Sequence, residues 1–174
     1  MTPALAAFLA VLAVQRAGEL VHARRNERRL RARGGREHAA GHFPLLVLVH
    51  VLFPLALVAE VLVLGARPGP LWPLWLSAWL AAQGLRYWAV ATLGDRWSVR
   101  IWTVPGEPPV ARGPYRFLRH PNYLAVGLEL VAAPLMFGAW RTALAIGALD
   151  AVALWIRIRA EERALGEEIA GGSV

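Results

Sequence analysis

The densest group of side chains able to do chemistry lies in the stretch GPYRFLRHPNYLAVGLEL, residues 113–130. Its first half is crowded with polar residues, and its second half is apolar apart from one acid, Glu129. Pro121 disfavours helix for the residue before it and is tolerated in a first helical turn, so a helix is predicted to begin here. A helix N-terminus attracts anions, and Asn122 near the cap, with Arg119 and His120 beside it, completes an expected anion site.

A second polar group, RIRAEERALGEE, follows the last apolar run. Arg157 and Glu161 are four residues apart and share a helix face, while Glu162 lies about 100° around the helix. The two carboxylates would suit an ammonium group or ribose hydroxyls. Together the two groups predict a bipolar pocket for a ligand with a carboxylate, an amine, a ribose and a positive centre. The alternative is a charge pattern at the inner leaflet with no ligand.

These groups belong to a chain whose composition indicates a lipid environment. It has 174 residues, of which 57% are hydrophobic, whereas a soluble domain is typically about 45–50% apolar. The chain contains no cysteine, which excludes disulfides, thiolate metal sites and a cysteine nucleophile.

Five apolar runs are candidates for membrane spans, which need about 20 residues each. Four of them cover residues 43–65, 71–93, 123–140 and 142–158, and a fifth, 3–21, carries Gln15, Arg16 and Glu19 in its second half. No basic residue precedes the first run, which favours an uncleaved membrane anchor over a signal peptide. The expected fold is an all-α, polytopic integral membrane protein with about five transmembrane helices and a cytoplasmic cofactor pocket.

Arginine distribution predicts the orientation. Loop 23–41 holds seven arginines, loop 94–122 holds five, and three follow Trp155, whereas the alternate connections contain only Arg67 and Arg141. The arginine-rich loops and the C-terminus are therefore expected to be cytoplasmic, with the N-terminus outside. The basic cluster 24–36 is interpreted as contacting lipid headgroups, so no nucleic-acid partner is predicted. Residues 1–174 form one expected domain, with three helices in 1–93, a cytoplasmic connector in 94–122, and a helical hairpin and C-terminal helix in 123–174.

Polar residues inside the spans need partners, because each buried charge costs about 2.5 kcal/mol or more on insertion scales. Arg16 and Glu19, three residues apart, are expected to form an ion pair. His50 is either a hydrogen-bonded packing residue or a substrate contact. Glu60 is expected to reach water at the outer end of its helix, and Glu129 to face a cavity open to the cytoplasm.

The stretches RGPYRFLRHPNYLAVGLEL and RIRAEERAL resemble the isoprenylcysteine carboxyl methyltransferase family of integral membrane enzymes, over about residues 83–166. The N-terminal half is similar to the small bacterial branch, whose members are often associated with lipid-like polyketides. The resemblance implies a bacterial inner-membrane protein that binds S-adenosylmethionine on the cytoplasmic side. It also implies a lipophilic substrate that enters from the bilayer. The cofactor would be lined by His120, Tyr123, Glu161 and Glu162, with Arg119 near the reacting centre.

The polar groups of the sequence and the family resemblance together indicate a candidate site. Arg119 is predicted to stabilise an anionic acceptor oxygen, and Glu129 is a candidate proton acceptor for a phenol, whereas a carboxylate acceptor needs none. The cofactor, which leaves as S-adenosylhomocysteine, is predicted to contact His120, Asn122, Tyr123, Arg157, Glu161 and Glu162. No metal site is expected, because only His38 and His42 are four residues apart, and they flank a glycine in a loop.

Other functions stay open at this point. A phospholipid-type N-methyltransferase would use the same cofactor, and a non-enzymatic membrane scaffold or channel would use the polar groups only for topology. A nicotinamide-dependent reductase would need a second nucleotide site, and the chain has no G-x-G-x-x-G stretch. Small residues in AVGLELVAAP could pack helices within one chain or between copies.

Overall fold

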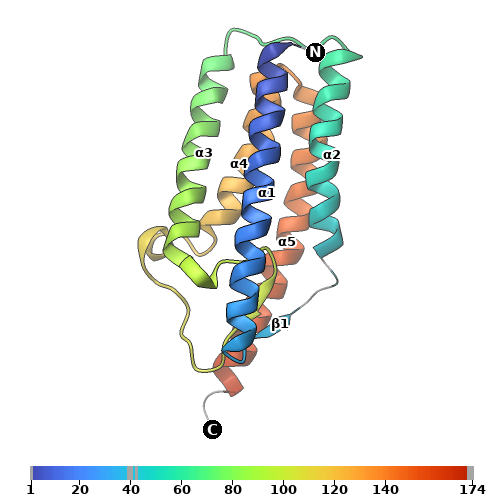
Figure 1. The fold of residues 1–174 in the computed structure, drawn as a ribbon. Helices are drawn as coiled ribbons and strands as arrows, with labels where there is room; N and C mark the ends of the chain where they lie inside the picture. The colour runs from blue at the N-terminus through green and yellow to red at the C-terminus, as the bar shows by residue number, and fades with distance from the viewer. Residues whose placement is uncertain (1, 39–40, 42, 172–174) are drawn as a thin grey trace.

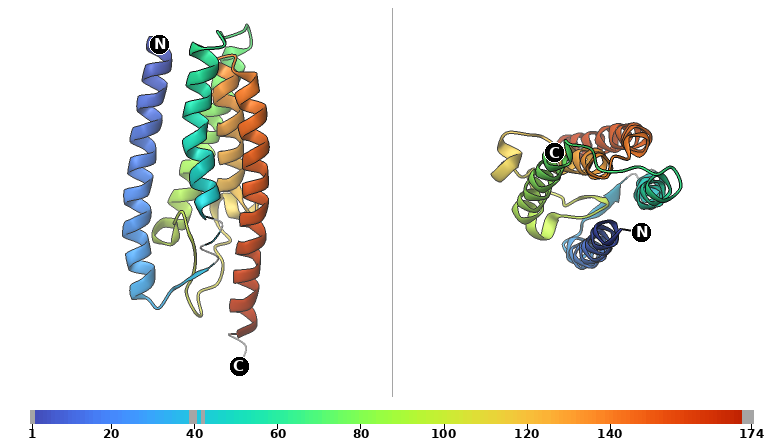
Figure 2. Two further views of the ribbon diagram at one scale, coloured as in Figure 1. Left: turned by 90° about the vertical axis from the view of Figure 1, so that its right-hand side faces the viewer. Right: turned by 90° about the horizontal axis from the view of Figure 1, so that it is seen from above.

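The computed structural model describes residues 2–38, 41 and 43–171, and in this part of the chain it contains five α-helices. They are α1 (Pro3–Ala32), α2 (Phe43–Leu62), α3 (Trp72–Leu93), α4 (Pro121–Met136) and α5 (Trp140–Gly171). The helices run alternately down and up an elongated bundle, with the two termini at opposite ends (Figure 1). A side view shows α1 standing apart from the other four helices over most of its length (Figure 2).

Each predicted apolar run forms a helix, but most of the helix boundaries differ from the predicted ones, and α5 continues to Gly171. α1 continues through Ala32 into the stretch expected to be a loop, because the arginines there are strong helix formers with no glycine or proline among them before Gly34. The fourth run was expected to end at Trp140. Instead α4 ends at Met136, Gly138 turns the chain with φ of 74°, and Trp140 begins α5.

Local sequence explains where the helices begin. Thr2 caps α1 by accepting a hydrogen bond from the Leu5 amide at 3.3 Å, and Pro3 follows at the first helical position. Pro121 likewise opens α4, with His120 at the cap position. The polar stretch singled out in the sequence therefore lies at a helix N-terminus, as predicted.

The bundle packs around an apolar core between α1, α2, α4 and α5. Phe8 makes edge-to-face contacts with Trp79 and Phe137, with ring centroids 5.7 and 5.4 Å apart. Many large apolar side chains lie on the outside, among them Val63, Leu144 and Trp155. A bundle with an apolar exterior is suited to lipid. Among the described helices, α1 and α2 are long and apolar enough to cross a bilayer.

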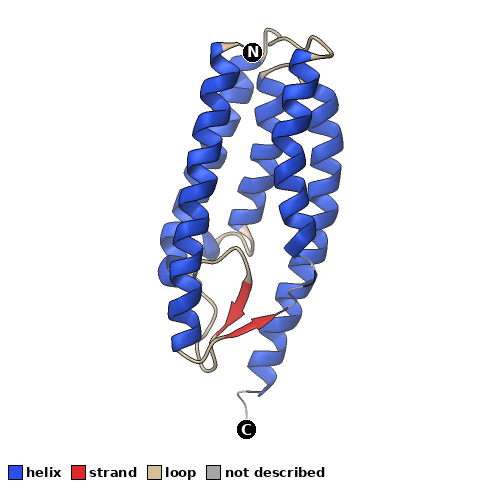
Figure 3. Cartoon of the chain, turned by 45° about the vertical axis from the view of Figure 1, so that its right-hand side comes forward, coloured by secondary structure: helices blue, strands red, loops and turns tan. Residues whose placement is uncertain are grey.

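The connections at the C-terminal end of the bundle contain two short strands, so the prediction of a purely α-helical chain was incomplete. β1 (Arg36–His38) pairs antiparallel with β2 (Ile101–Thr103), in the register Glu37 to Trp102 (Figure 3). Two 3₁₀ turns, η2 (Gly94–Arg96) and η3 (Gly113–Arg116), complete the long connection between α3 and α4. The side chain of Asn26, fully buried, donates hydrogen bonds to the carbonyls of Gly94 and Trp97 at 3.0 and 2.9 Å. These contacts fix the lower end of α1 against the connection.

Candidate functional site

Five of the predicted residues meet where the start of α4 faces the second half of α5. We call this group, which consists of His120, Tyr123, Arg157, Glu161 and Glu162, the α4–α5 cluster. α4 supplies His120 at its cap and Tyr123 in its first turn, and α5 supplies the other three at helical spacing. Residues 34 or more positions apart in sequence are thus in contact, at the end of the bundle that holds the C-terminus.

The centre of the cluster is a chain of hydrogen bonds. Arg157 Nε donates to the Tyr123 hydroxyl at 2.7 Å, and that hydroxyl donates to the Glu161 carboxylate. A second donor of Arg157, Nη1, binds the Val99 carbonyl at 2.8 Å, so the guanidinium is also tied to the connection before α4. Arg157 is buried and lies over the Tyr123 ring, 5.3 Å from its centroid. Tyr123 and Arg157 therefore fix the position of the Glu161 carboxylate.

His120 and Asn122 present polar atoms that the described protein leaves unused. The His120 ring stacks on Tyr123, with centroids 5.3 Å apart and planes 12° from parallel. Its buried Nε2 has no hydrogen-bond partner among the described residues, and neither has the buried Oδ1 of Asn122. Glu162 Oε1 lies 3.7 Å from His120 Nε2, within reach of an ion pair if the ring is protonated. Buried polar atoms without partners are costly, so both are available to a ligand.

Tyr115, in η3, lies near the same carboxylate. Its partial burial and the negative charge of Glu161 raise the pKa of the Tyr115 phenol above its ordinary value. The phenol is therefore neutral at physiological pH and offers a donor.

The two residues predicted to take part in the chemistry lie outside the cluster's contacts. Arg119 is exposed and forms no ion pair in the described part of the chain. Glu129 is buried six residues beyond Tyr123, about 9 Å along the helix axis at 1.5 Å per residue. Glu129 belongs to a second polar group, deeper in the bundle.

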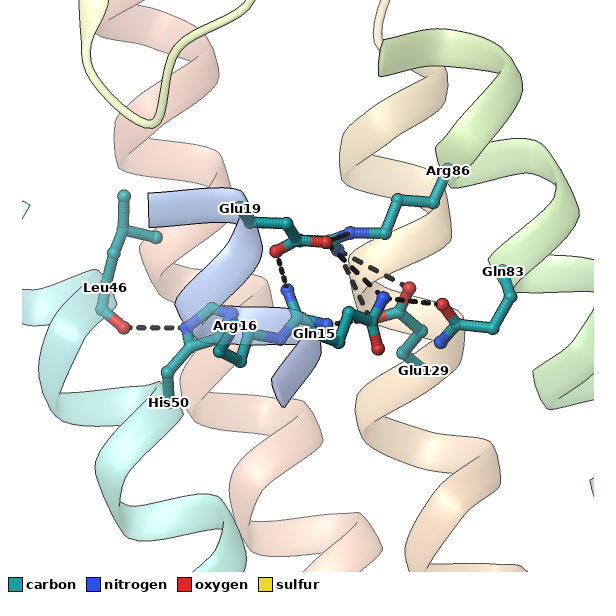
Figure 4. A network of polar contacts seen from close by, with 8 residues as sticks. All are labelled: Gln15, Arg16, Glu19, Leu46, His50, Gln83, Arg86 and Glu129. Atoms are coloured by element: carbon teal, nitrogen blue, oxygen red, sulfur yellow. Dashed lines mark hydrogen bonds and ion pairs between the residues drawn. The ribbon is translucent and has the colours of Figure 1, made fainter. Parts of the chain in front are cut away.

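This second group is an ionic network that joins α1, α3 and α4 (Figure 4). Arg86 donates to both oxygens of Glu19, at 2.7 and 2.8 Å, and to Glu129 at 3.2 Å. Arg16 contacts the same two acids, Glu19 at 2.8 Å and Glu129 at 2.6 Å. Two guanidinium groups and two carboxylates thus cancel one another's formal charge. The predicted pair of Arg16 and Glu19 is confirmed, but as half of a network that also includes Arg86 and Glu129.

Two amides and a histidine border the network. Gln15 Nε2 donates to Gln83 Oε1 at 2.7 Å, which adds a neutral link between α1 and α3. His50 bonds through Nδ1 to the Leu46 carbonyl at 2.8 Å, as expected of a hydrogen-bonded packing residue, and its role as a substrate contact stays a prediction. With Arg16 and Glu129 it also lines a cavity of about 20 Å³, which is large enough for one water molecule.

Glu60 does not reach water, contrary to the prediction. It is 4% exposed, and its carboxylate accepts hydrogen bonds from the backbone amides of Arg141 and Thr142 at 3.1 and 2.6 Å and from the Thr142 hydroxyl at 2.7 Å. An acid at this place caps the N-terminus of α5 and complements the helix dipole. The sequence places Glu60 near a helix end but does not show which other helix begins beside it.

A larger groove, of about 280 Å³, lies between α1 and α3. Its lining is mainly apolar, with Gln15, Glu19 and His22 on the α1 side and Tyr87 and Val90 on α3. Neither this groove nor the small cavity includes a residue of the α4–α5 cluster. Within the described residues there is no group of three or more histidine, aspartate or glutamate side chains placed to hold a metal ion, and His42 lies outside those residues.

Comparison with known proteins gives one family and two relatives. Residues 75–167 match the model of the isoprenylcysteine carboxyl methyltransferase (ICMT) family. The chain is 41% identical to the uncharacterized protein YpbQ of Bacillus subtilis over 160 residues, which are 92% of this chain and 95% of that protein. It is 27% identical to an uncharacterized protein of Haemophilus influenzae over 142 residues, which cover 81% of this chain and 83% of that protein. No solved structure matches it significantly.

Proposed function

Because the chain belongs to the isoprenylcysteine carboxyl methyltransferase family, a family of membrane methyltransferases, we propose that it is an S-adenosylmethionine-dependent O-methyltransferase. The acceptor would be a carboxylate or phenolic hydroxyl on a lipophilic molecule. The α4–α5 cluster would bind the cofactor. The observation that carries the proposal is the contact of His120 and Tyr123, at the start of α4, with each other and with Glu161 in the second half of α5.

The proposal includes an orientation in the membrane. The five helices of the single domain 1–174 would lie in a bacterial inner membrane, with the N-terminus outside and the C-terminal end of the bundle in the cytoplasm. The positive-inside rule supports this, since the arginine-rich segments 23–36 and 94–119 are at that end (Figure 1). The large apolar side chains on the bundle's outer surface support lipid contact along its length.

The residues of the cluster fit the polar groups of the cofactor. Glu162 is partly exposed and its carboxylate could bind an ammonium group, while Glu161, held by Tyr123, could accept from hydroxyls. His120 Nε2 and Asn122 Oδ1 are buried atoms that a ligand could satisfy at the start of α4. The N-terminus of that helix favours the cofactor's carboxylate. Arg157 acts through Tyr123 and is a positioning residue.

When bound, the cofactor supplies an electrophilic methyl group, and the protein has to orient the acceptor and exclude water. Arg119, which precedes His120 in the chain, would hold an anionic acceptor oxygen. Glu129 accepts hydrogen bonds from two guanidinium groups, so its protonation would disrupt contacts that join α1, α3 and α4. An acceptor that is already ionised, a carboxylate, therefore fits this chain better than a phenol. The lipophilic acceptor would enter from the bilayer.

Calorimetry on detergent-purified protein tests the cofactor site. Wild type should bind S-adenosylmethionine and S-adenosylhomocysteine, and His120→Ala and Glu162→Ala should lose most of that affinity. Arg163→Ala is the matched control, because Arg163 is exposed on the same helix and bonds only to the Arg159 carbonyl among the described residues. Binding that survives in both cluster variants, or that Arg163→Ala weakens equally, would overturn the assignment of the site.

Methyl transfer from labelled cofactor into lipid extracts tests the reaction. Extracts that contain acidic or phenolic lipids should yield a labelled methyl ester or ether, and Arg119→Ala should lower the rate while it leaves cofactor binding intact. Label found on an amine nitrogen would instead establish the phospholipid-type N-methyltransferase. Cofactor binding without transfer to any lipid class would count against a lipophilic acceptor.

A further inference from the structure

The segment that leads into the α4–α5 cluster is a compact turn on the outside of the bundle. We call residues 112–119 the η3 wedge. Gly113 has a φ of 57°, and a Cβ there would lie 2.4 Å from the Thr92 hydroxyl, so the wedge is seated directly against the end of α3. Pro114 is buried, and its carbonyl accepts the amides of Phe117 and Leu118 at 3.1 and 3.0 Å. The wedge therefore has a fixed shape and a fixed base.

The tip of the wedge is apolar and points away from the protein. Phe117 is 70% exposed and Leu118 is 40% exposed. Apolar side chains exposed to water are less stable than the same side chains buried in an apolar medium. Contact with lipid would therefore stabilise these two side chains. The described residues leave most of Phe117 and part of Leu118 uncovered.

Three arginines lie next to this tip in the sequence. Arg112, Arg116 and Arg119 are all exposed, and none forms an ion pair within the described residues. The Arg116 guanidinium lies 5.0 Å from the centroid of the Phe117 ring, which keeps that charge beside the apolar tip. Positive charge next to exposed apolar side chains matches the boundary between phospholipid phosphates and acyl chains.

Helix lengths place the wedge at that boundary. α3 has 22 residues and α4 has 16, which correspond to about 33 and 24 Å at 1.5 Å per residue. A bilayer core is about 30 Å thick, so α3 has the length to cross it and α4 is shorter than the core by about 6 Å. The start of α4 and the wedge before it thus lie beside the lower part of α3, not beyond it (Figure 1).

We propose that the η3 wedge is an interfacial binding site for an anionic phospholipid. Phe117 and Leu118 contact the upper acyl chains, and Arg112 and Arg116 bind the phosphate-containing headgroup. The wedge ends at Arg119 and is followed directly by His120, so the bound lipid would lie beside the proposed cofactor pocket. This inference rests on the membrane orientation proposed above.

The absence of cysteine from the sequence allows a clean test with single labels. A bimane fluorophore is attached to Phe117→Cys in nanodiscs that contain a phospholipid carrying a nitroxide on its acyl chain, either phosphatidylglycerol or phosphatidylcholine. Leu144→Cys, 65% exposed on α5, reports membrane insertion, and Arg28→Cys, on the exposed end of α1, reports the aqueous side. Leu118→Cys provides a second label on the wedge.

Strong quenching is expected at positions 117 and 144, and little at 28. At position 117, labelled phosphatidylglycerol should quench as strongly as an about fivefold or more higher concentration of labelled phosphatidylcholine. This ratio corresponds to about 1 kcal/mol, the contribution of one arginine to the binding of an anionic lipid. Arg112→Gln with Arg116→Gln should remove that preference and leave the total quenching unchanged. Position 144 should show no preference.

The outcomes separate the inference from the proposal on which it rests. Quenching at 144 with none at 117 or 118 refutes the wedge as a lipid site and leaves the membrane architecture standing. Equal quenching by the two lipids at 117 refutes the anionic preference. If position 144 is no better quenched than 28, the proposed architecture fails and the inference fails with it.

Discussion

Replacement of Arg86 by methionine is the sharpest test of the ionic network. Arg86 is 4% exposed and is the only residue of α3 that contributes a charge to the group drawn in Figure 4. It donates to Glu19 through two nitrogens and to Glu129 through a third. Its removal leaves two carboxylates, the buried Glu129 and the half-buried Glu19, opposite the single charge of Arg16. Breaking a buried pair in this way costs about 3–5 kcal/mol, mainly because an uncompensated charge stays behind.

The network also predicts how a second substitution behaves. Glu19→Met alone leaves an excess positive charge, but Arg86→Met together with Glu19→Met removes one charge of each sign. The pair of Arg16 and Glu129, 2.6 Å apart, then remains neutral by itself. The double variant should therefore lose less unfolding free energy than the two single variants lose together. The difference should be about 1–3 kcal/mol, within the range of coupling between residues in contact.

Unfolding by sodium dodecyl sulfate in mixed micelles, followed by circular dichroism, measures these free energies. Arg28→Met is the matched control, since Arg28 is exposed and bonds only within its own helix among the described residues. It should change stability by less than about 0.5 kcal/mol. The reasoning is refuted if Arg86→Met is as mild as the control, or if the losses of the two single variants simply add.

Three further substitutions test other contacts. Tyr123→Phe keeps the stack on His120 but removes the hydroxyl that positions Glu161, so calorimetry should show about tenfold weaker cofactor binding, from about 1.5 kcal/mol for a hydrogen bond to a charged group; unchanged affinity would contradict that role. Asn26→Ala removes one donor each from the Gly94 and Trp97 carbonyls and should lower the unfolding free energy by about 1–3 kcal/mol in the detergent titration, whereas wild-type stability would show that α1 is held by other contacts. Glu60→Ala removes the cap of α5 and should cost about 1–2 kcal/mol in the same titration; a neutral result would mean that the cap is dispensable.

The fold was largely predictable because a long run of apolar residues indicates a helix suited to lipid. Each of the five apolar runs forms a helix, and Pro121 opens α4 where it was expected to. The lower part of α1 was misjudged since charge density says where a chain meets water, not whether it is helical. The pairing of β1 with β2 joins three-residue strands more than 60 positions apart, too short to show a period of their own.

The candidate site was predictable to the extent that helical spacing reports contacts. Arg157 and Glu161 lie on one face of α5, as their spacing requires, and that face meets Tyr123. The spacing of residues along the sequence does not predict contacts between different helices. Arg86 and Glu129 were recognisable as polar residues inside apolar runs, but a sequence alone does not show that α3 and α4 bring them to the same place as Glu19. A charge inside a predicted span indicates that a partner exists and leaves the partner's helix open.

The placement of Glu129 bears on which acceptor the protein would methylate. As a lone acid in an apolar helix it was a reasonable proton acceptor, and a phenolic substrate would need one. In the folded chain both of its oxygens already accept hydrogen bonds from Arg86, and Arg16 binds one of them as well. To take a proton, Glu129 would have to give up stabilisation by two guanidinium groups that have no other carboxylate than Glu19 in this network. A carboxylate acceptor avoids this cost, because it is ionised before it reaches the site and asks of the protein only a positive charge to orient it. Arg119, exposed and without an ion pair in the described chain, is suited to supply that charge.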